Sequence, residues 1–344
     1  MTNTEQVDFW QAFRFWSKLC FISFGGPAGQ IAIMHQELVE NRRWISERRF
    51  LHALNYCMVL PGPEAQQLAI YIGWLMHRTL GRVVPDKFTV GGAHSTTDKT
   101  FGPALIDDHT PTPEHACFSW PRLLRVLVIG ALLWLIPMTL LTSVFGWDHT
   151  LTQMGWFFTK AALLTFGGAY AVLPYVYQGA VGHYAWLTPT QMIDGLALGE
   201  TTPGPLIMVV AFVGFVGGYV KAQFGAENLF LAGALAATLV TWFTFLPSFL
   251  FILIGGPLIE TTHNDLKFTA PLTAITAAVV GVILNLALFF GYHVWWPTGF
   301  ADSIDVVSVL ITLAAAVALF RFKHNVIHVI AACAVIGLII KTLL

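Results

Sequence analysis

The chain has 344 residues, of which 56% are hydrophobic and only 11% are charged, and its formal net charge is −1. In a soluble domain roughly a quarter of all residues are charged. A chain with this composition and a mean hydropathy of +0.67 is therefore not an ordinary soluble protein. Lipid is the expected surroundings of most of the chain, and the near-neutral charge gives no reason to expect a nucleic-acid partner.

The first apolar segment contains a sequence motif that occurs a second time in the chain. "FWSKLCFISFGGPAG" at Phe15–Gly29 returns as "FFTKAALLTFGGAYA" at Phe157–Ala171. With Phe15 placed on Phe157, the segment 15–63 aligns with the segment 157–205 without a gap, and both segments end in Pro-Gly-Pro. Internal repeats of this size are the building plan of many transporters, so the sequence predicts two homologous halves.

The stretch between the two copies has a different composition. The segment 65–76 is the last apolar run before the segment 81–121, which is rich in Pro, Gly, Thr and Asp and predicts a loop. The predicted division is therefore a first repeat half over 1–80, a polar linker over 81–121, and a second half over 122–344. The first half is truncated relative to the second, because the second Pro-Gly-Pro triplet is followed by the long and mostly apolar segment 206–344.

Long uncharged runs predict the membrane-crossing elements. Five of them are long enough to cross a bilayer as helices: Val126–Trp147, Ala161–Gly182, Thr201–Val220, Leu229–Ile259 and Phe268–Tyr292. About 20 apolar residues cross the ~30 Å hydrocarbon layer, and the backbone must be hydrogen bonded within each segment, which favours helices. Two shorter runs, Val306–Phe320 and Asn325–Ile340, cross only where the bilayer thins or flanking residues help. The predicted fold class is an all-α, polytopic membrane protein.

Basic residues give a partial orientation. Four arginines are expected in one short loop between the first two motifs: Arg42, Arg43, Arg48 and Arg49. By the positive-inside bias this loop and the basic linker are cytoplasmic candidates.

The repeated Gly-Gly and Pro-Gly-Pro motifs predict broken or re-entrant helices. Glycine adopts backbone conformations that other residues avoid, and a proline inside a helix costs ~3 kcal/mol or more. Irregular backbone at membrane depth occurs only where protein or a wet cavity surrounds it, and half-helix N-termini attract anions. The motifs therefore predict a central oxyanion site, formed by Gly25, Gly26, Pro61, Gly62, Pro63, Gly167, Gly168, Pro203, Gly204 and Pro205.

Side chains near the motifs are candidate partners of the anion. Lys18 and Lys160 each stand about two helical turns before a Gly-Gly pair, about 10 Å of helix rise, and supply long-range attraction. The candidate hydroxyl groups are those of Ser23, Thr165, Thr201 and Thr202. The alternative interpretation is that both lysines extend to the membrane interface and that the glycines only permit close helix packing.

Two acidic residues lie next to the Pro-Gly-Pro motifs. Glu64 follows the first triplet and Glu200 precedes the second, but the repeat places Leu206 and Met58 at the equivalent positions. An acid near a broken membrane segment is a candidate for proton coupling, or for pairing with Arg or Lys when the site is empty. The alternative is a carboxylate that reaches headgroup water at a helix end.

No catalytic or cofactor-binding pattern is visible in the sequence. The linker histidines His94, His109 and His115 lack zinc-like spacing, and no nucleophile elbow, P-loop or dinucleotide fingerprint occurs. We therefore expect a protein that is not an enzyme and that needs neither a metal nor another cofactor.

The motifs together resemble those of the chromate ion transporter family, in its long form with two halves. The resemblance lies in "FGGP…WISERRFLHALNYCMVLPGPEAQQLAIYIGW", in "FGGAYAVLPYVYQGAVGHYAWLTPTQMIDGLALGETTPGP" and in "ALIDDHTPTP" ahead of the second half. It implies outward secondary transport of chromate across the cytoplasmic membrane, hence chromate resistance, with sulfate as the look-alike anion. Long members have further helices after the first Pro-Gly-Pro, whereas here Leu80-Gly81-Arg82 runs into the linker.

Three functional hypotheses follow. The first is a chromate exporter, and the second is a carrier of sulfate or another tetrahedral dianion. The third is a non-transporting, shortened membrane remnant or partner subunit, which the short first half motivates. Expected partners are the anion, the lipid bilayer and a second copy of the chain, because a homodimer would complete the cavity of a shortened chain. The transport direction and the coupling ion stay open at this point.

Overall fold

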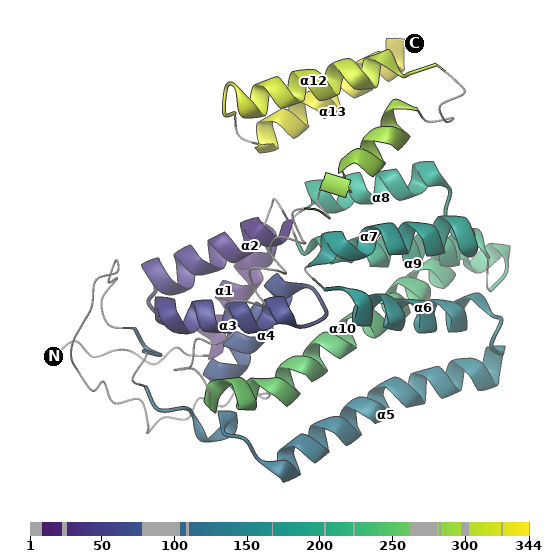
Figure 1. Cartoon of the computed structure of the whole chain (residues 1–344). Helices are drawn as coiled ribbons and strands as arrows, with labels where there is room; N and C mark the ends of the chain where they lie inside the picture. The colour runs from purple at the N-terminus through teal and green to yellow at the C-terminus, as the bar shows by residue number, and fades with distance from the viewer. Residues whose placement is uncertain are drawn as a thin grey trace.

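The computed structural model describes residues 9–22, 26–77, 104–107, 110–166, 168–202, 204–222, 224–261, 281, 284–285, 287–296, 303–324 and 326–343. The described chain is almost entirely helical. Its helices form two groups, one from each repeat copy, and the long helix α10 (Leu229–Thr261) passes along both of them (Figure 1). Helix α5 (Trp120–Phe145) lies along the outside of α10.

The two groups contain the same α-helices and π-helical turns in the same order, and the second has one additional 3-10 turn, η4. The first has α1 (Phe9–Ile22), α2 (Gly26–His35), the π-helical turn η1 (Gln36–Asn41), α3 (Glu47–Val59) and α4 (Glu64–His77). The second has α6 (Thr150–Leu164), α7 (Ala169–Tyr177), the π-helical turn η3 (Gln178–His183), α8 (Pro189–Thr201), η4 (Leu206–Met208) and α9 (Val209–Val220). The offset that places Phe15 on Phe157 also places η1 on η3 and α3 on α8.

The backbone conformations at the breaks also follow this offset. Gly26 and Gly168 have φ of +70° and +95°, and Gly62 and Gly204 have φ of +133° and +137°. Positive φ favours glycine, and values near +135° are essentially confined to it, which explains why the repeat keeps glycine at these positions. The two copies therefore share their breaks as well as their helices.

The breaks leave helices that are too short to cross a bilayer individually. The α-helices of the two groups have 9 to 15 residues, a rise of about 14–23 Å against a hydrocarbon layer of ~30 Å. Two described helices are long and apolar enough to cross it, Trp120–Phe145 and Ala226–Glu260. Only 11% of the apolar window of the first is buried, so most of α5 presents Leu, Ile and Val to its surroundings.

Helix α10 joins two hydrophobic cores. Val240 and Phe243 belong to the core of the second group, whereas Ile252, further along the same helix, belongs to the core of the first. Pro247 lies between these two contact regions, inside the helix. Because proline lacks a backbone N–H, it removes one i→i−4 hydrogen bond at that point.

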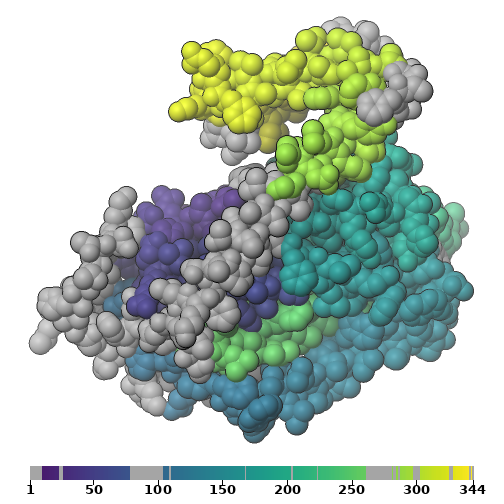
Figure 2. Space-filling model, viewed as in Figure 1, coloured from purple at the N-terminus to yellow at the C-terminus, as the bar shows by residue number. Residues whose placement is uncertain are grey.

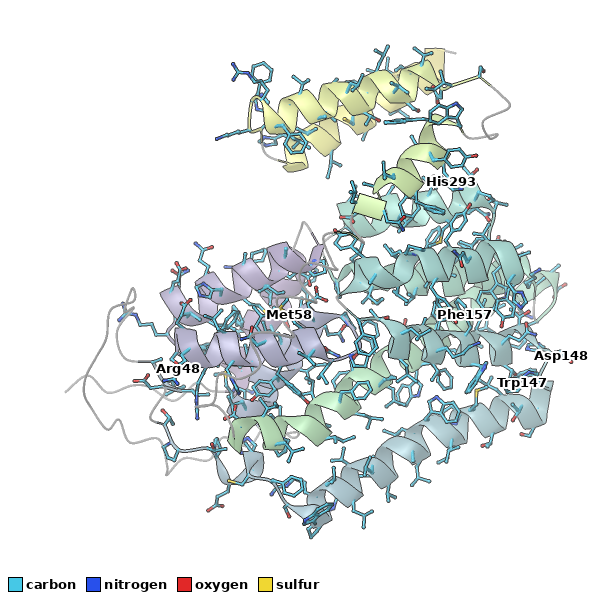
Figure 3. All side chains as sticks on the ribbon, in the orientation of Figure 1. Arg48, Met58, Trp147, Asp148, Phe157 and His293 are labelled. Carbon is cyan, nitrogen blue, oxygen red and sulfur yellow. The ribbon has the colours of Figure 1, made fainter. Side chains whose placement is uncertain are left out.

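One expectation from the sequence is wrong: Arg48 and Arg49 are not in a loop. The Ser46 side chain accepts a hydrogen bond from the backbone N–H of Arg49 at 3.2 Å and so caps α3, which begins at Glu47. Figure 3 shows Arg48 near the outer end of α3 and Met58 near the inner end, beside the second group. Arg49 points into the protein and is only 4% exposed.

The end of the linker is fastened to the first group. Ile106 forms an isolated parallel bridge with Ile45 and is buried in the first core, and His115 makes a hydrogen bond to the carbonyl of Trp74 at 3.0 Å. Helices α12 (Val306–Phe320) and α13 (Val326–Leu343) pack against each other. They project from the rest of the molecule, with mostly exposed apolar side chains (Figure 2).

Candidate functional site

The breaks of the two repeat copies meet where the two groups of helices adjoin. The backbone N–H of Gly62 donates to the carbonyl of Thr165 at 2.6 Å, which joins the first Pro-Gly-Pro to the segment before the second Gly-Gly. Reciprocally, Nε2 of Gln30 on α2 donates to the carbonyl of Gly204 at 2.5 Å. Each Pro-Gly-Pro is therefore held by the Gly-Gly region of the other copy.

Close contacts at Gly26 and Gly168 also join the two repeat copies. A Cβ atom on Gly26 would lie 2.6 Å from the hydroxyl oxygen of Tyr170, and one on Gly168 would lie 2.5 Å from Oε1 of Glu64. Both glycines are needed because a side chain of the opposite copy occupies the space of their missing Cβ atom. Gly26, Glu64, Gly168 and Gly204 thus belong to one site.

Helix N-termini converge on this site. Helix α2 begins at Gly26, α4 at Glu64 and α7 at Ala169, and the η4–α9 segment begins at Leu206. The first N–H groups of a helix have no partner within the helix, and the N-terminus carries about half a positive charge. Several such ends in one place form an environment that favours an anion.

A cavity of about 1280 Å³ adjoins the site between the two groups of helices. Its polar lining includes Gln30, Gln66, Thr202 and the backbone at Gly204, and the remaining lining is mainly apolar. The first group contributes α1, α2 and α4 to its wall, the second contributes α8 and α9, and α10 completes it. None of its lining residues is a lysine or arginine among the described part of the chain.

The two candidate lysines lie outside this cavity. Lys18 is on α1 and lines a separate hollow of about 540 Å³ with Arg14 and Arg42. The ammonium group of Lys160 lies 5.8 Å from the ring centre of Trp156, one helical turn earlier on α6. Any effect of these lysines on an anion at the breaks must therefore act over a distance.

The candidate hydroxyl groups donate to their own helices in this conformation. Oγ1 of Thr165 donates to the carbonyl of Ala161 at 2.6 Å. Oγ1 of Thr201 donates to the carbonyl of Ala197 at 2.8 Å, and Oγ1 of Thr202 to that of Leu198 at 2.7 Å. Thr165 is buried, whereas Thr201 and Thr202 are exposed.

The described prolines of the breaks either accept hydrogen bonds or line the cavity. The carbonyl of Pro61 accepts a hydrogen bond from Nε2 of Gln67 at 2.8 Å, and that of Pro63 accepts one from the backbone N–H of Gln67 at 3.0 Å. Pro205 lines the cavity. Four of the predicted site residues, Ser23, Gly25, Gly167 and Pro203, lie outside the described residues.

Sequence reasoning missed several residues of this site, among them Gln30, Tyr170 and Ser248. Gln30 and Tyr170 follow the two Gly-Gly pairs closely, and Ser248 lies in the apolar run of α10. Ser248 is fully buried, and its Oγ lies 2.5 Å from the position of a Cβ on Gly62. Each of the three is a polar side chain in an apolar segment, which is a feature that could have marked it as a candidate site residue. Only Gln30 and Tyr170 are also close to a repeated motif, so Ser248 had the weaker signal.

The chain matches one protein family over nearly its whole length. The model of the chromate transporter family matches residues 10–147 and 152–338. The chromate transport protein of Cupriavidus metallidurans is 26% identical over 397 positions, covering 97% of this chain and 94% of that protein. That alignment is longer than the 344 residues of this chain, so the relative has residues that this chain lacks.

Two further relatives bear on the organisation of the chain. The chromate transport protein of Pseudomonas aeruginosa is 26% identical over 343 positions, covering 79% of each chain. The uncharacterized transporter YwrA of Bacillus subtilis is 30% identical over 192 positions, which are 54% of this chain but 95% of that protein. A protein related to about half of this chain thus exists by itself. No solved structure matches the chain.

Proposed function

This chain belongs to the chromate transporter family of multi-pass membrane proteins, and from this membership and the geometry of the breaks we propose that it transports chromate. The proposed direction is export across the cytoplasmic membrane, with chromate resistance of the cell as the result. The relatives in Cupriavidus metallidurans and Pseudomonas aeruginosa are named chromate transport proteins, which supports the choice of substrate.

The observation that carries the proposal is the meeting of the helix N-termini at Gly26, Glu64, Gly168 and Gly204. Chromate is a tetrahedral dianion, and backbone N–H groups at helix ends can replace its hydration shell without a fixed cation. The adjoining cavity gives the ion a route between the two repeat copies. The short helices on either side fit re-entrant segments whose tips meet inside the membrane.

The membrane potential favours the proposed direction. Moving one elementary charge through about 100 mV changes its free energy by ~2.3 kcal/mol, so a dianion gains about twice that on leaving a negative interior. Export therefore does not require a nucleotide-driven step.

The direct test is a chromate accumulation assay in cells that express the chain. We expect these cells to hold less chromate than cells with empty vector and to survive higher chromate concentrations. The matched inactive control is Gly62→Ala, which introduces a side chain at φ +133° and against Ser248. Equal chromate content in expressing and vector cells, with the protein present in the membrane, would instead favour a non-transporting, shortened form. Competition by sulfate in vesicles tests whether a second tetrahedral dianion is carried.

Lys18 and Lys160 are expected to strengthen anion binding by electrostatic attraction from outside the cavity. A unit charge and a dianion about 10 Å apart interact by about 0.8 kcal/mol in water, so Lys18→Ala should raise the half-saturating chromate concentration about fourfold. Lys18→Arg keeps the charge and should not change it. The difference should shrink in high salt, because solvated charges are screened. Unchanged transport in Lys18→Ala and Lys160→Ala would restrict both lysines to the membrane interface.

A further inference from the structure

Two acids that the repeat does not relate converge on one tyrosine. The side chain of Tyr170 on α7 lies within electrostatic reach of both Glu200, in the last turn of α8, and Glu64. Glu64 is the first residue of α4, and both of its carboxylate oxygens lie against Gly168. Tyr170 in turn lies against Gly26, so the acids approach the meeting point of the breaks from two sides.

We propose that Glu64, Tyr170 and Glu200 form a proton site, and that Glu64 must take up a proton before the anion occupies the neighbouring helix N-termini. The inference rests on the proposed function, because it specifies how the same site accepts a dianion. An ionised Glu64 would occupy the positive end of α4 itself and would repel the anion.

No described cation neutralises the two acids. Ion pairs among the described residues join His35 to Glu40 and Glu47, Arg42 to Glu37, and Arg49 to Glu260, and none of these includes Glu64 or Glu200. Oε2 of Glu64 is buried and has no hydrogen-bond partner among the described residues. A proton is thus the simplest species that removes this negative charge.

Independent polar groups at the same break also have unused oxygen atoms. Gln67 and Ser248 are fully buried beside Gly62, and Oε1 of Gln67 and Oγ of Ser248 have no partner in the described part of the chain. Oε1 of Gln66, on the preceding position of α4, is also buried and without one. The break thus holds several buried oxygen atoms without a partner among the described residues, and a proton on Glu64 would supply one further donor beside them.

The titratable groups around Glu64 come from three elements. Cys57 on α3 is within electrostatic reach of Glu64, and α7 and α8 contribute Tyr170 and Glu200. The neighbouring residues of α2 and α10, Gln30 and Ser248, do not titrate. Because Oε2 of Glu64 is buried without a partner among the described residues, we assign the exchanging proton to Glu64. Tyr170 interacts with both acids, so we assign the positioning of the pair to Tyr170.

The stoichiometry fits the proposed export. One proton and one chromate dianion together carry one negative charge, which a negative cell interior still drives outward. Binding is expected to be linked reciprocally: the anion favours the proton, and the proton favours the anion by the same factor.

The test is isothermal titration of the purified full chain with chromate at mildly alkaline pH, where chromate is a dianion. Paired titrations in HEPES and Tris buffers, whose ionisation enthalpies differ and whose buffer species are not tetrahedral oxyanions, give the number of protons taken up. We expect about one proton per chromate, and an apparent Kd that rises about tenfold per pH unit once Glu64 is ionised. Glu64→Gln should take up no proton and bind independently of pH. Tyr170→Phe should shift this pH dependence without changing the stoichiometry.

A matched control and a second measurement keep the outcome decisive. Glu227→Gln removes an exposed acid away from the site and should behave like the unaltered protein. In the unaltered protein, chromate should also produce the infrared band of a protonated carboxyl group, which needs no variant. Chromate binding without proton uptake, uptake that persists in Glu64→Gln, or dependence on sodium instead of pH would overturn the proton site alone. Absence of any chromate binding would overturn the proposed function and the proton site with it.

Discussion

Replacement of Arg49 by methionine is expected to lower the free energy of unfolding by about 3–5 kcal/mol, the cost of leaving one member of a buried ion pair without its partner. Arg49 and Glu260 are 4% and 3% exposed, and Nη2 of Arg49 lies 3.6 Å from Oε2 of Glu260. Tyr71 also donates a hydrogen bond to Glu260, and Nη2 of Arg49 donates to the carbonyl of Thr110 at 3.0 Å. The pair therefore ties α3 to α10 and to the end of the linker.

The measurement is the fraction of protein that remains monodisperse in detergent after heating, followed by size-exclusion chromatography. Arg48→Met is the matched control, because Arg48 is more exposed than Arg49 and lies one position earlier on the same helix. The double variant Arg49→Met/Glu260→Met should recover most of the loss, since it leaves no buried charge unpaired. If Arg49→Met were as stable as Arg48→Met, the pair would not hold these elements together.

Substitution of Gly168 by alanine is expected to abolish chromate binding. Gly168 has φ +95° and ψ 175°, a region essentially confined to glycine, so the backbone strain alone costs about 1–3 kcal/mol. In addition, the new methyl group would lie 2.5 and 2.6 Å from the two carboxylate oxygens of Glu64. The carboxylate would have to move, and with it the first turn of α4 at the proposed anion site. Chromate titration of the folded variant measures the effect.

Two glycine variants separate the backbone strain from the contact with Glu64. Gly204→Ala carries similar strain at φ +137° but meets no atom within 4 Å, so it should bind chromate better than Gly168→Ala. Gly73→Ala, on α4, has neither strain nor contact and should bind normally. Equal losses in Gly168→Ala and Gly204→Ala would mean that the contact with Glu64 is unimportant.

The repeat was the most informative feature of the sequence. Its single offset relates α3 to α8 and η1 to η3, and the repeated glycines include those with positive φ at Gly26, Gly62, Gly168 and Gly204. Glycine and proline act through the local backbone, so their effect can be predicted from their identity and position alone. The family and its membrane class followed from the same motifs.

The partners across the site could not be predicted in this way. Nothing local indicates that Gly62 donates to Thr165 or that Gln30 reaches Gly204, because both pairs are far apart in the sequence. Arg49 was misassigned because four arginines close together suggested a loop, whereas Ser46 starts a helix that turns one of them inward. The convergence of Glu64 and Glu200 on Tyr170 likewise depends on the packing of α4, α7 and α8.

Helix α10 limits how the two repeat copies can move. Because its first part is anchored in one core and its last part in the other, the copies cannot rock apart as independent bodies while the helix stays straight. Opening the space between the copies requires α10 to bend. The bend costs least at Pro247, where one backbone hydrogen bond of the helix is already absent. Of the two prolines inside α10, only Pro247 lies between the two contact regions, so the structure favours this position for such a bend.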